Sequence, residues 1–481
     1  MTRAFRKPTQ PARQPHDYQR RAVEWLLGHC GAALFLSPGL GKTSIVLRAL
    51  LTLKDSKIGK RALVLAPLRV AHEVWPREAE EWAGTEWERL RELRCVFLHG
   101  KDKDKLIQQD AEVFVVNYDG LEWLFSDMKR FRALGIDTLV ADESSYLKHT
   151  RTKRFKLLKP MLNTFARRWI LTGSPISNGF LDIFGQIFVI DSGAALSPYI
   201  THFRQEFFSP VDRFGWEWRL KPGADKLIEA RIAPYVMRLE AEDYVKMPAV
   251  VENVVRVELP PAARKVYDKL EEELFAELEG GRAVTALGAG AAAVKCSQAA
   301  NGSVYADREG ATTEREVVKL HDAKTDAVEE LLAENDAPAL CIYEYAHDLS
   351  KLRERFGKDV PNIGGGTSLK ETARLVDEWN AGRVPLLLCQ PAAMSHGINM
   401  QKSPVAPHII FHSLIYDYER ADQLIRRVRR QGSRHAEVWV HYVVARNTID
   451  EAKLRALRKK EKTQKDFLAA LREYAKNFAS P

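Results

Sequence analysis

The sequence Ser37-Pro38-Gly39-Leu40-Gly41-Lys42-Thr43 decides the fold through its two flanks. It follows an apolar run at 32–36 that is typical of a buried parallel strand. It precedes residues 44–51, whose apolar side chains recur at the spacing of a helix with one buried face. A strand, a glycine-containing turn and a helix N-terminus form a cradle whose backbone N–H groups bind phosphate oxygens. The stretch therefore predicts a phosphate-binding loop.

Each residue type in this loop has a chemical reason. Lys42 is expected to reach the β- and γ-phosphates, and the Thr43 hydroxyl is expected to bind Mg²⁺. The strict pattern has glycine where this chain has Leu36, five residues before Gly41. A chance Gly-Lys-Thr in an ordinary turn is the alternative, which the flanking strand and helix disfavour. The other cradle residues are Pro38, Gly39, Leu40, Gly41 and Ser44.

Composition sets broad limits. The chain has 481 residues, enough for two or three domains, and 45% hydrophobic and 28% charged residues, as in ordinary globular proteins. The net charge of +9 suits a nucleic-acid partner, but it suits a merely basic protein equally well. The five cysteines form no Cys-x-x-Cys, so neither a zinc site nor a disulfide framework is expected.

Nothing in the sequence indicates a membrane. The basic start lacks an apolar core, so no signal peptide is expected. No apolar run approaches the roughly 20 residues that span a bilayer. A cytoplasmic location, in a bacterial or phage-infected cell, is the expectation.

Apolar runs alternate with helical patterns in two parts of the chain. Such alternation predicts parallel sheets covered by helices, hence an α/β fold. The Gly- and Ala-rich residues 280–293 are either a flexible crossing or a loosely packed helix. Strands are expected at 32–36, 62–66, 95–98, 113–116, 138–141 and 169–172, and again at 339–343, 384–389, 408–411 and 438–443. The predicted divisions are a loose arm (1–15), a first domain (16–235), a helical linker (236–318), a second domain (319–448) and a basic C-terminal helix (449–481).

An adjacent pair of carboxylates, Asp142-Glu143, ends a predicted strand about 100 residues after the phosphate loop. Asp142 is expected to hold Mg²⁺ through its water shell, and Glu143 to orient and deprotonate the attacking water. Pairs of this kind are common on protein surfaces. The position at the end of an apolar strand, downstream of a phosphate loop, favours the catalytic interpretation.

Positive side chains crowd residues 422–432, near the end of the second domain. Such a cluster is costly to bury without anions and could supply charge to a γ-phosphate in the transition state. A basic helix that faces nucleic acid is the alternative, and the two roles can coexist because successive side chains point to different faces. The cluster comprises Gln423, Arg426, Arg427, Arg429 and Arg430.

Together these motifs resemble the superfamily-two helicase-like ATPases, specifically their Snf-type branch of chromatin-remodeller-like double-stranded-DNA translocases. The resemblance runs from about residue 16 to residue 451. It implies two tandem RecA-like domains, with a short helical insertion between them, that bind ATP and Mg²⁺ at their interface. It further implies that Gln19 contacts adenine, that Gly397 and Gln423 lie at the nucleotide, and that Arg427 and Arg430 are arginine fingers.

The chain departs from that family in places. Ser144-Ser145 replaces Ala-His after the acidic pair, so we expect Ser145 to make the link to the coupling motif at 171–178. Arg426 stands where the family usually has glycine. No appended remodelling module is recognised, which suggests a short bacterial or phage form.

The predicted function is a DNA-dependent ATPase that translocates on double-stranded DNA through phosphate contacts. A strand-separating DNA or RNA helicase is the alternative, and 207–220 could contain the small β element that it needs. A nucleic-acid-binding module without turnover is disfavoured, because Lys42, Asp142, Glu143 and both arginines are present.

Overall fold

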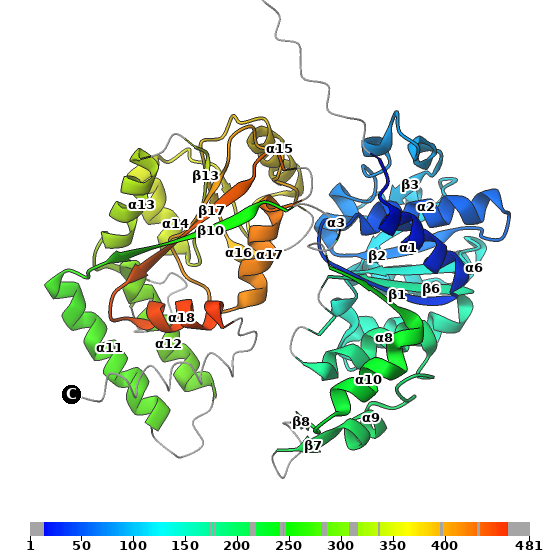
Figure 1. Cartoon of the computed structure of the whole chain (residues 1–481), viewed down its shortest axis with the longest axis horizontal. Coiled ribbons are helices and arrows are strands. Elements are labelled where there is room, and N and C mark those ends of the chain that lie inside the picture. Colours follow the sequence, from blue (N-terminus) through cyan, green and yellow to red (C-terminus); the bar gives the residue numbers. More distant parts are fainter. Residues whose placement is uncertain are drawn as a thin grey trace, which may run out of the picture. The chain divides into compact units, whose positions relative to one another are not determined.

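The chain forms two compact units, residues 1–245 and 246–481 (Figure 1). The computed structural model describes residues 14–173, 175–176, 179–211, 218–240, 244, 247–279, 286–306, 316–334, 337–394, 398–430 and 433–459. The predicted arm at 1–15 lies almost wholly outside this part.

The first unit is built on a parallel sheet of seven strands in the order β3-β4-β2-β5-β6-β1-β9. All residues of the central strands β2 and β5 are buried, so both faces of the sheet are covered. The six predicted strands are confirmed. The bounds are β1 Gly31–Leu36, β2 Ala62–Ala66, β3 Cys95–Phe97, β4 Val113–Asn117, β5 Thr138–Asp142, β6 Arg167–Thr172 and β9 Val236–Leu239.

Helices connect and cover these strands. The most buried is α8, Ile183–Asp191, in which only the last residue is not buried, as expected of a helix that is apolar all round. The small β element anticipated in 207–220 is present as the antiparallel pair β7 Phe208–Pro210 and β8 Trp218–Leu220. The other helices are α1 Asp17–Gly28, α2 Lys42–Asp55, α3 Leu68–Glu73, α4 Lys103–Leu106, α5 Leu121–Ser126, α6 Met128–Ala133, α7 Lys153–Leu158, α9 Ile200–Phe207 and α10 Ala224–Ile232.

The second unit has a parallel sheet of six strands in the order β10-β17-β16-β13-β15-β14. Its four predicted strands are confirmed, whereas the sequence did not predict the two-residue strand β14 or the edge strand β10. This edge strand is only half-buried, and Glu252, Asn253 and Arg256 interrupt its apolar run. The bounds are β10 Ala249–Val257, β13 Ala339–Ile342, β14 Asn362–Ile363, β15 Leu386–Cys389, β16 His408–Phe411 and β17 Glu437–Ala445.

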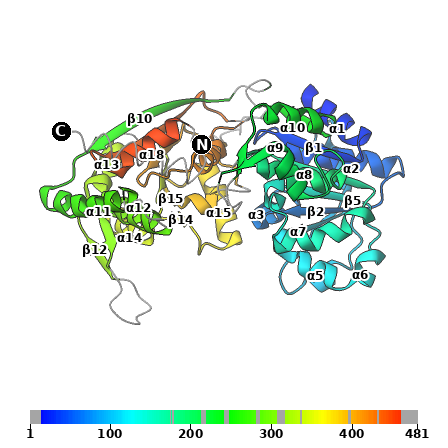
Figure 2. The ribbon, with the colours of Figure 1, turned by 90° about the horizontal axis from the view of Figure 1, so that it is seen from below.

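The predicted linker at 236–318 contains strands of both sheets, because β9 pairs with β1 and β10 pairs with β17. Its helical part is α11, Pro261–Glu279, and α12, Ala286–Asn301. These two helices lie side by side in Figure 2 and pack together through small buried residues such as Ala299 and Ala300. The Gly- and Ala-rich stretch is thus helical from Ala286 onward.

The remaining elements complete the second unit. The antiparallel pair β11 and β12 follows α12. The predicted C-terminal helix is present as α18, and its continuation beyond residue 459 lies outside the described residues. The bounds are β11 Ser303–Tyr305, β12 Val317–Lys319, α13 Ala323–Ala333, α14 Ala346–Phe356, α15 Leu369–Asn380, α16 Pro391–Met394, α17 Tyr418–Val428 and α18 Ile449–Arg458.

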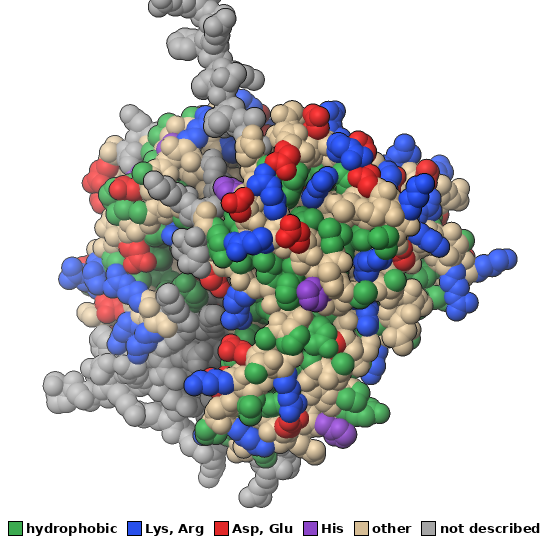
Figure 3. Space-filling view, turned by 45° about the vertical axis from the view of Figure 1, so that its right-hand side comes forward, with side chains coloured by type: hydrophobic (Ala, Val, Ile, Leu, Met, Phe, Trp, Pro, Cys, Tyr) green, Lys and Arg blue, Asp and Glu red, His purple; other side chains and the backbone are tan. Residues whose placement is uncertain are grey.

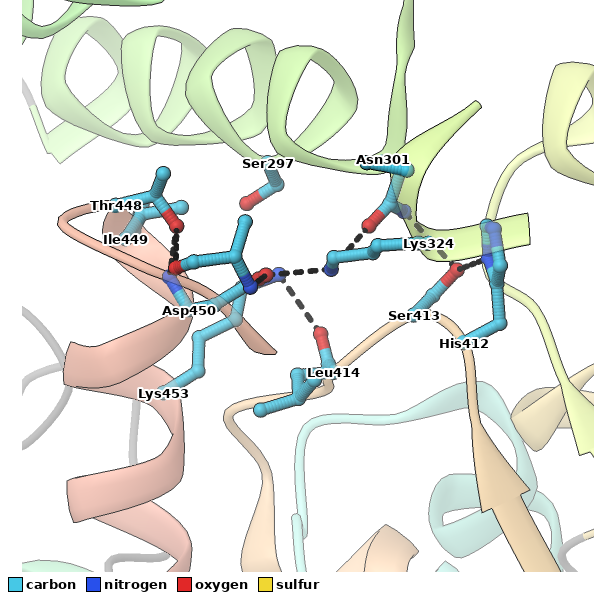
Figure 4. A network of polar contacts seen from close by, with 12 residues as sticks. Ser297, Asn301, Lys324, His412, Ser413, Leu414, Thr448, Ile449, Asp450 and Lys453 are labelled. Carbon is cyan, nitrogen blue, oxygen red and sulfur yellow. Dashed lines mark hydrogen bonds and ion pairs between the residues drawn. The ribbon is translucent and has the colours of Figure 1, made fainter. Parts of the chain in front are cut away.

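A buried polar network joins α12, α13, β16 and α18 inside the second unit (Figure 4). Lys324, which is 0% exposed, lies 2.5 Å from the Asp450 carboxylate and donates a hydrogen bond to Asn301. Asn301 in turn donates to Ser413, and Lys453 donates to the Leu414 carbonyl. Buried charges need such partners, so the network requires all of these elements to pack in one arrangement.

Replacing Lys324 by Met is expected to destabilise the second unit by about 3–5 kcal/mol, because it leaves the buried Asp450 carboxylate without its cation. The measurement is urea unfolding of the full chain, followed by hydrogen exchange of peptides from β13 and β16. The matched control is Lys319→Met, whose ion pair with Asp322 is half-exposed and worth about 1 kcal/mol or less. Equal effects of the two substitutions would contradict this view of the network.

Candidate nucleotide site

The phosphate loop connects β1 to α2 as predicted. Gly39 and Gly41 adopt φ of 97° and 76°, a left-handed conformation that glycine takes at little cost. A Cβ on Gly41 would lie 2.4 Å from the Gln19 side chain and 2.9 Å from the Ser44 hydroxyl. Glycine is therefore required at this position for two reasons: the backbone is left-handed, and the neighbouring side chains leave no room for a Cβ.

The side chain of Lys42 folds back toward the start of the phosphate loop. Lys42 Nζ donates a 2.8 Å hydrogen bond to the carbonyl of Leu36, the residue that departs from the strict pattern. Leu36 itself is buried at the end of β1. Because this hydrogen bond is made to the backbone of Leu36, an apolar side chain at this position is compatible with the loop. Thr43 and Ser44 are buried at the start of α2.

Gln19 reaches the loop from α1, 21 residues before Leu40 in the chain. Its side chain accepts a hydrogen bond from the His16 backbone N–H and donates a 3.4 Å hydrogen bond to the Leu40 carbonyl. The residue is 3% exposed. The structure thus brings the predicted adenine-contacting residue against the phosphate loop.

The acidic pair stands at the carboxyl end of β5, on the same edge of the sheet as the loop. The Asp142 side chain accepts hydrogen bonds from the Trp75 indole, at 2.9 Å, and from the Glu143 backbone N–H, at 3.0 Å. Tyr118 donates its hydroxyl to the Asp142 carbonyl at 2.7 Å. Burial, together with the neighbouring Glu143 charge, raises the pKa of Asp142 to about 6.

Glu143 occupies a strained position. Its φ of 51° is in the left-handed region, which non-glycine residues adopt only where the surroundings hold them. Strain of this kind is concentrated at functional sites. The geometry therefore singles out Glu143 within the acidic pair.

The loop after β6 packs on the phosphate loop. A Cβ on Gly173 would lie 3.0 Å from Cδ of Pro38. Among the described residues, Ser144 makes the link from the acidic pair to this loop, whereas the sequence predicted it at Ser145. Ser144 donates to Gln186, and Gln186 donates to the Pro175 carbonyl, each at 2.7 Å. Ser144 is buried, and it directly follows Glu143, whose left-handed conformation turns the chain.

The arginine cluster lies on and just after α17 of the second unit. Arg426 pairs with Asp422 at 2.6 Å, so its charge is already neutralised within the helix. Arg427 is buried, and Arg430 donates a hydrogen bond to the Asn399 side chain. Gln423 lies on the same helix and is half-buried. Gly397 lies outside the described residues.

Sequence reasoning missed several residues that shape the site. Trp75 and Tyr118 hold Asp142, Gln186 binds Ser144, and Glu240 accepts a 2.7 Å hydrogen bond from Ser37 in the phosphate loop. A buried glutamine in the otherwise apolar α8 was the one signal that could have revealed Gln186.

The donor set at the site suits Mg²⁺, which prefers hydroxyl, carboxylate and phosphate oxygens. Asp142 is buried, with 4% of its surface exposed, and its carboxylate accepts hydrogen bonds from two neutral N–H groups. Among the described residues no group of three or more His, Cys, Asp or Glu side chains is arranged to hold a metal ion. Thr43 and Asp142 offer one hydroxyl and one carboxylate, so a cation held by them would share its coordination with nucleotide phosphates and water.

Within the described part of the chain, no helix has the length and apolar character needed to cross a membrane.

Comparisons with known proteins cover most of the chain. Phage protein p41 of Acyrthosiphon pisum secondary endosymbiont phage 1 is 34% identical, over 95% of this chain and 98% of its own length. The ATP-dependent helicase/translocase YwqA of Bacillus subtilis is 22% identical, over 90% of this chain and 46% of its own length. The DNA repair and recombination protein RAD54B of Gallus gallus is 23% identical, over 88% and 50%. The chain thus spans about half the length of the latter two relatives.

Among solved structures, the SWI2/SNF2 ATPase core of Sulfolobus solfataricus in complex with dsDNA aligns with 99% of this chain and 97% of that chain, at 20% identity and a TM-score of 0.42. The model of the SNF2-related domain matches residues 18–299, more than half of the sequence. With this match and the identity to the phage protein, the chain belongs to the SNF2-related family of helicase-like ATPases.

Proposed function

We propose that this protein hydrolyses ATP in response to DNA and uses the energy to translocate on the duplex. One observation carries this proposal: three segments lie together at one edge of the first sheet. They are the phosphate loop, the strained Asp142–Glu143 turn and the loop that follows β6 and contains Gly173 and Pro175, here called the coupling loop. A site with these three parts can bind a triphosphate and activate water, and its hydrolysis rate can respond to the binding of a second ligand.

The residues of the first unit have separate roles in this proposal. Backbone N–H groups of the loop and Lys42 bind the phosphates, and Gln19 selects adenine. Thr43 and Asp142 would hold Mg²⁺, which neutralises charge on the phosphates when bound. Glu143 orients the attacking water and accepts its proton. Arg427 and Arg430 of the second unit supply positive charge to the γ-phosphoryl group in the transition state.

The charge distribution supports a polyanionic partner. Lys and Arg side chains are interspersed with acidic ones on the face drawn in Figure 3, so that face as a whole has no single sign. Residues 144–181, in contrast, contain no Asp or Glu. Eight cations lie in this segment: Lys148, Arg151, Lys153, Arg154, Lys156, Lys159, Arg167 and Arg168.

Several of these cations face solvent without a counter-ion. Arg151, Lys156 and Lys159 are exposed, and none forms an ion pair with the described residues. Arg204 of α9 lies over the Trp218 ring, and burial together with the nearby Arg151 lowers its pKa. Positive side chains that lie close together on a surface attract anions, and the phosphates of nucleic acid are anions of this kind. Contacts of this kind position a duplex without reading its sequence.

The proposed function is tested by measuring ATP turnover without nucleic acid and with duplex DNA, single-stranded DNA or RNA. Stimulation by duplex DNA, together with displacement of a triplex-forming strand, supports translocation. Equal or greater stimulation by RNA would overturn the proposal. Turnover that survives in Lys42→Ala would overturn the site assignment.

Arg151→Ala and Lys156→Ala are each expected to weaken DNA binding and to reduce the slope of log affinity against log salt by about 1, because each removes a phosphate contact. Fluorescence anisotropy with a labelled duplex at several salt concentrations measures this. Arg89→Ala is the matched control, since Arg89 is already paired with Asp55 and Glu92. An unchanged salt slope in both test variants would remove this segment from the DNA-binding surface.

Strand separation remains the second candidate function, because the β7–β8 pair could form a wedge. Trp218, at the start of β8, packs against the Arg204 guanidinium of the same unit. This aromatic side chain of the β7–β8 pair is therefore already in contact within the unit. A forked duplex distinguishes the candidates: a strand-separating helicase releases the displaced strand, whereas a translocase hydrolyses ATP without release.

A further inference from the structure

We propose that Gln186 is a positioning residue that couples the Asp142–Glu143 turn to the loop after β6, so that duplex binding changes the rate of ATP hydrolysis through it. This inference rests on the proposed function. It concerns a side chain on α8 whose hydrogen bonds go to Ser144, Pro175 and Asp182.

The hydrogen bonds of Gln186 determine its orientation. Its Oε1 accepts from the Ser144 hydroxyl at 2.7 Å. Its Nε2 donates to the Pro175 carbonyl at 2.7 Å and to the Asp182 carbonyl at 2.9 Å. With the amide reversed, oxygen would face two carbonyl oxygens, so only one orientation is acceptable. Gln186 and Ser144 are both 0% exposed, which makes each of these bonds costly to lose.

The helix that carries Gln186 is seated directly on the turn after Glu143. A Cβ on Gly185 would lie 2.3 Å from the Leu147 carbonyl oxygen and 2.7 Å from that of Lys148, so only glycine permits this approach. Lys148 and Asp182 form an ion pair at 3.2 Å beside it, with the Asp182 side chain 5% exposed. The turn and α8 are therefore held as one rigid piece.

The packing of α8 on this turn matters because Glu143 has a strained backbone conformation. A left-handed non-glycine residue keeps its conformation only while its surroundings hold it, and Ser144 is the next residue in the chain. Pro175 belongs to the coupling loop, whose Gly173 packs on Pro38 of the phosphate loop. A displacement of that loop would shift the Gln186 amide and, through Ser144, the Glu143 carboxylate. Displacements of about 1 Å are enough to change rates strongly.

The test uses the full chain with Ser144→Ala, Gln186→Leu and the double variant. Each single variant is expected to lower kcat at saturating duplex DNA by roughly 2- to 30-fold, with an unchanged KM for ATP. If the two residues act as one link, the double variant falls no further than the more affected single variant. Additive losses would overturn the link.

The matched control is Ser192→Ala at the C-terminal end of the same helix, where the hydroxyl accepts a 2.6 Å hydrogen bond from Arg168. It removes one hydrogen bond of α8 far from the acidic pair. A merely structural role for Gln186 predicts that its variant loses thermal stability as Ser192→Ala does while DNA stimulation is kept. That outcome would overturn the inference.

A second readout separates this inference from the proposed function. If wild-type turnover responds to no nucleic acid, the proposed function fails. Hydrogen exchange of the peptide covering 169–176 still tests the physical link. Faster exchange there in Ser144→Ala than in Ser192→Ala supports it, and equal exchange contradicts it.

Discussion

Glu143→Gln is expected to lower ATP turnover by roughly 10²–10⁴-fold while ATP binding is retained. The amide keeps the size of the side chain but cannot accept a proton from the attacking water. Asp142 keeps its hydrogen bonds to Trp75 and to the backbone of residue 143, so its proposed role in holding the cation is expected to be unaffected. Stopped-flow binding of a fluorescent ATP analogue and steady-state hydrolysis measure the two quantities separately.

The control for this substitution is Glu122→Gln, an exposed carboxylate that pairs with Lys153. Its turnover should stay within twofold of wild type, since surface ion pairs contribute little. If Glu143→Gln retains turnover within tenfold of wild type, Glu143 is not the base. A loss of nucleotide binding would instead indicate that the substitution relaxed the strained turn.

Arg430→Ala is expected to lower turnover by roughly 10³–10⁵-fold, the range found for arginine fingers. Its guanidinium donates to the Asn399 side chain, which holds it just beyond the end of α17. Arg430→Lys should recover little, because an ammonium cannot reproduce the planar, bidentate contact with a phosphoryl group. Single-turnover hydrolysis with saturating ATP and duplex DNA measures the chemical step.

Arg426→Ala is the matched control on the same helix. Arg426 is ion-paired with Asp422, so its removal leaves a partly exposed carboxylate, and the proposal gives Arg426 no contact with the γ-phosphate. Turnover within a few-fold of wild type is expected. Equal losses in the two variants would show that the helix, and not a guanidinium at the γ-phosphate, was disturbed.

The sequence predicts the buried strands better than the edge strands and the contacts of the site. Ten strands were predicted from apolar runs, because buried parallel strands are apolar along their whole length. The edge strand β10 was not predicted, since one side of it meets solvent and tolerates Glu252 and Arg256. The same reason explains why the predicted linker turned out to contain strands of both sheets.

At the site, sequence order identified the residues that must lie at strand ends. Gly39, Gly41, Lys42 and Asp142 could be found because backbone conformation and strand position constrain them locally. The link after the acidic pair was predicted at Ser145 and found at Ser144. A one-residue difference of this kind depends on the left-handed turn at Glu143, which no periodicity in the sequence encodes.

The sequence by itself determined two α/β units, the phosphate loop, the acidic pair and the arginine cluster, because each follows from a short pattern of side chains with its own local physical cause. Only the tertiary structure decided which distant residues hold these groups in place. Trp75 and Tyr118 each donate one hydrogen bond to Asp142, and Gln186 binds both Ser144 and the Pro175 carbonyl. The partner of a buried polar side chain is set by how helices and strands pack, and packing joins residues that the sequence keeps far apart.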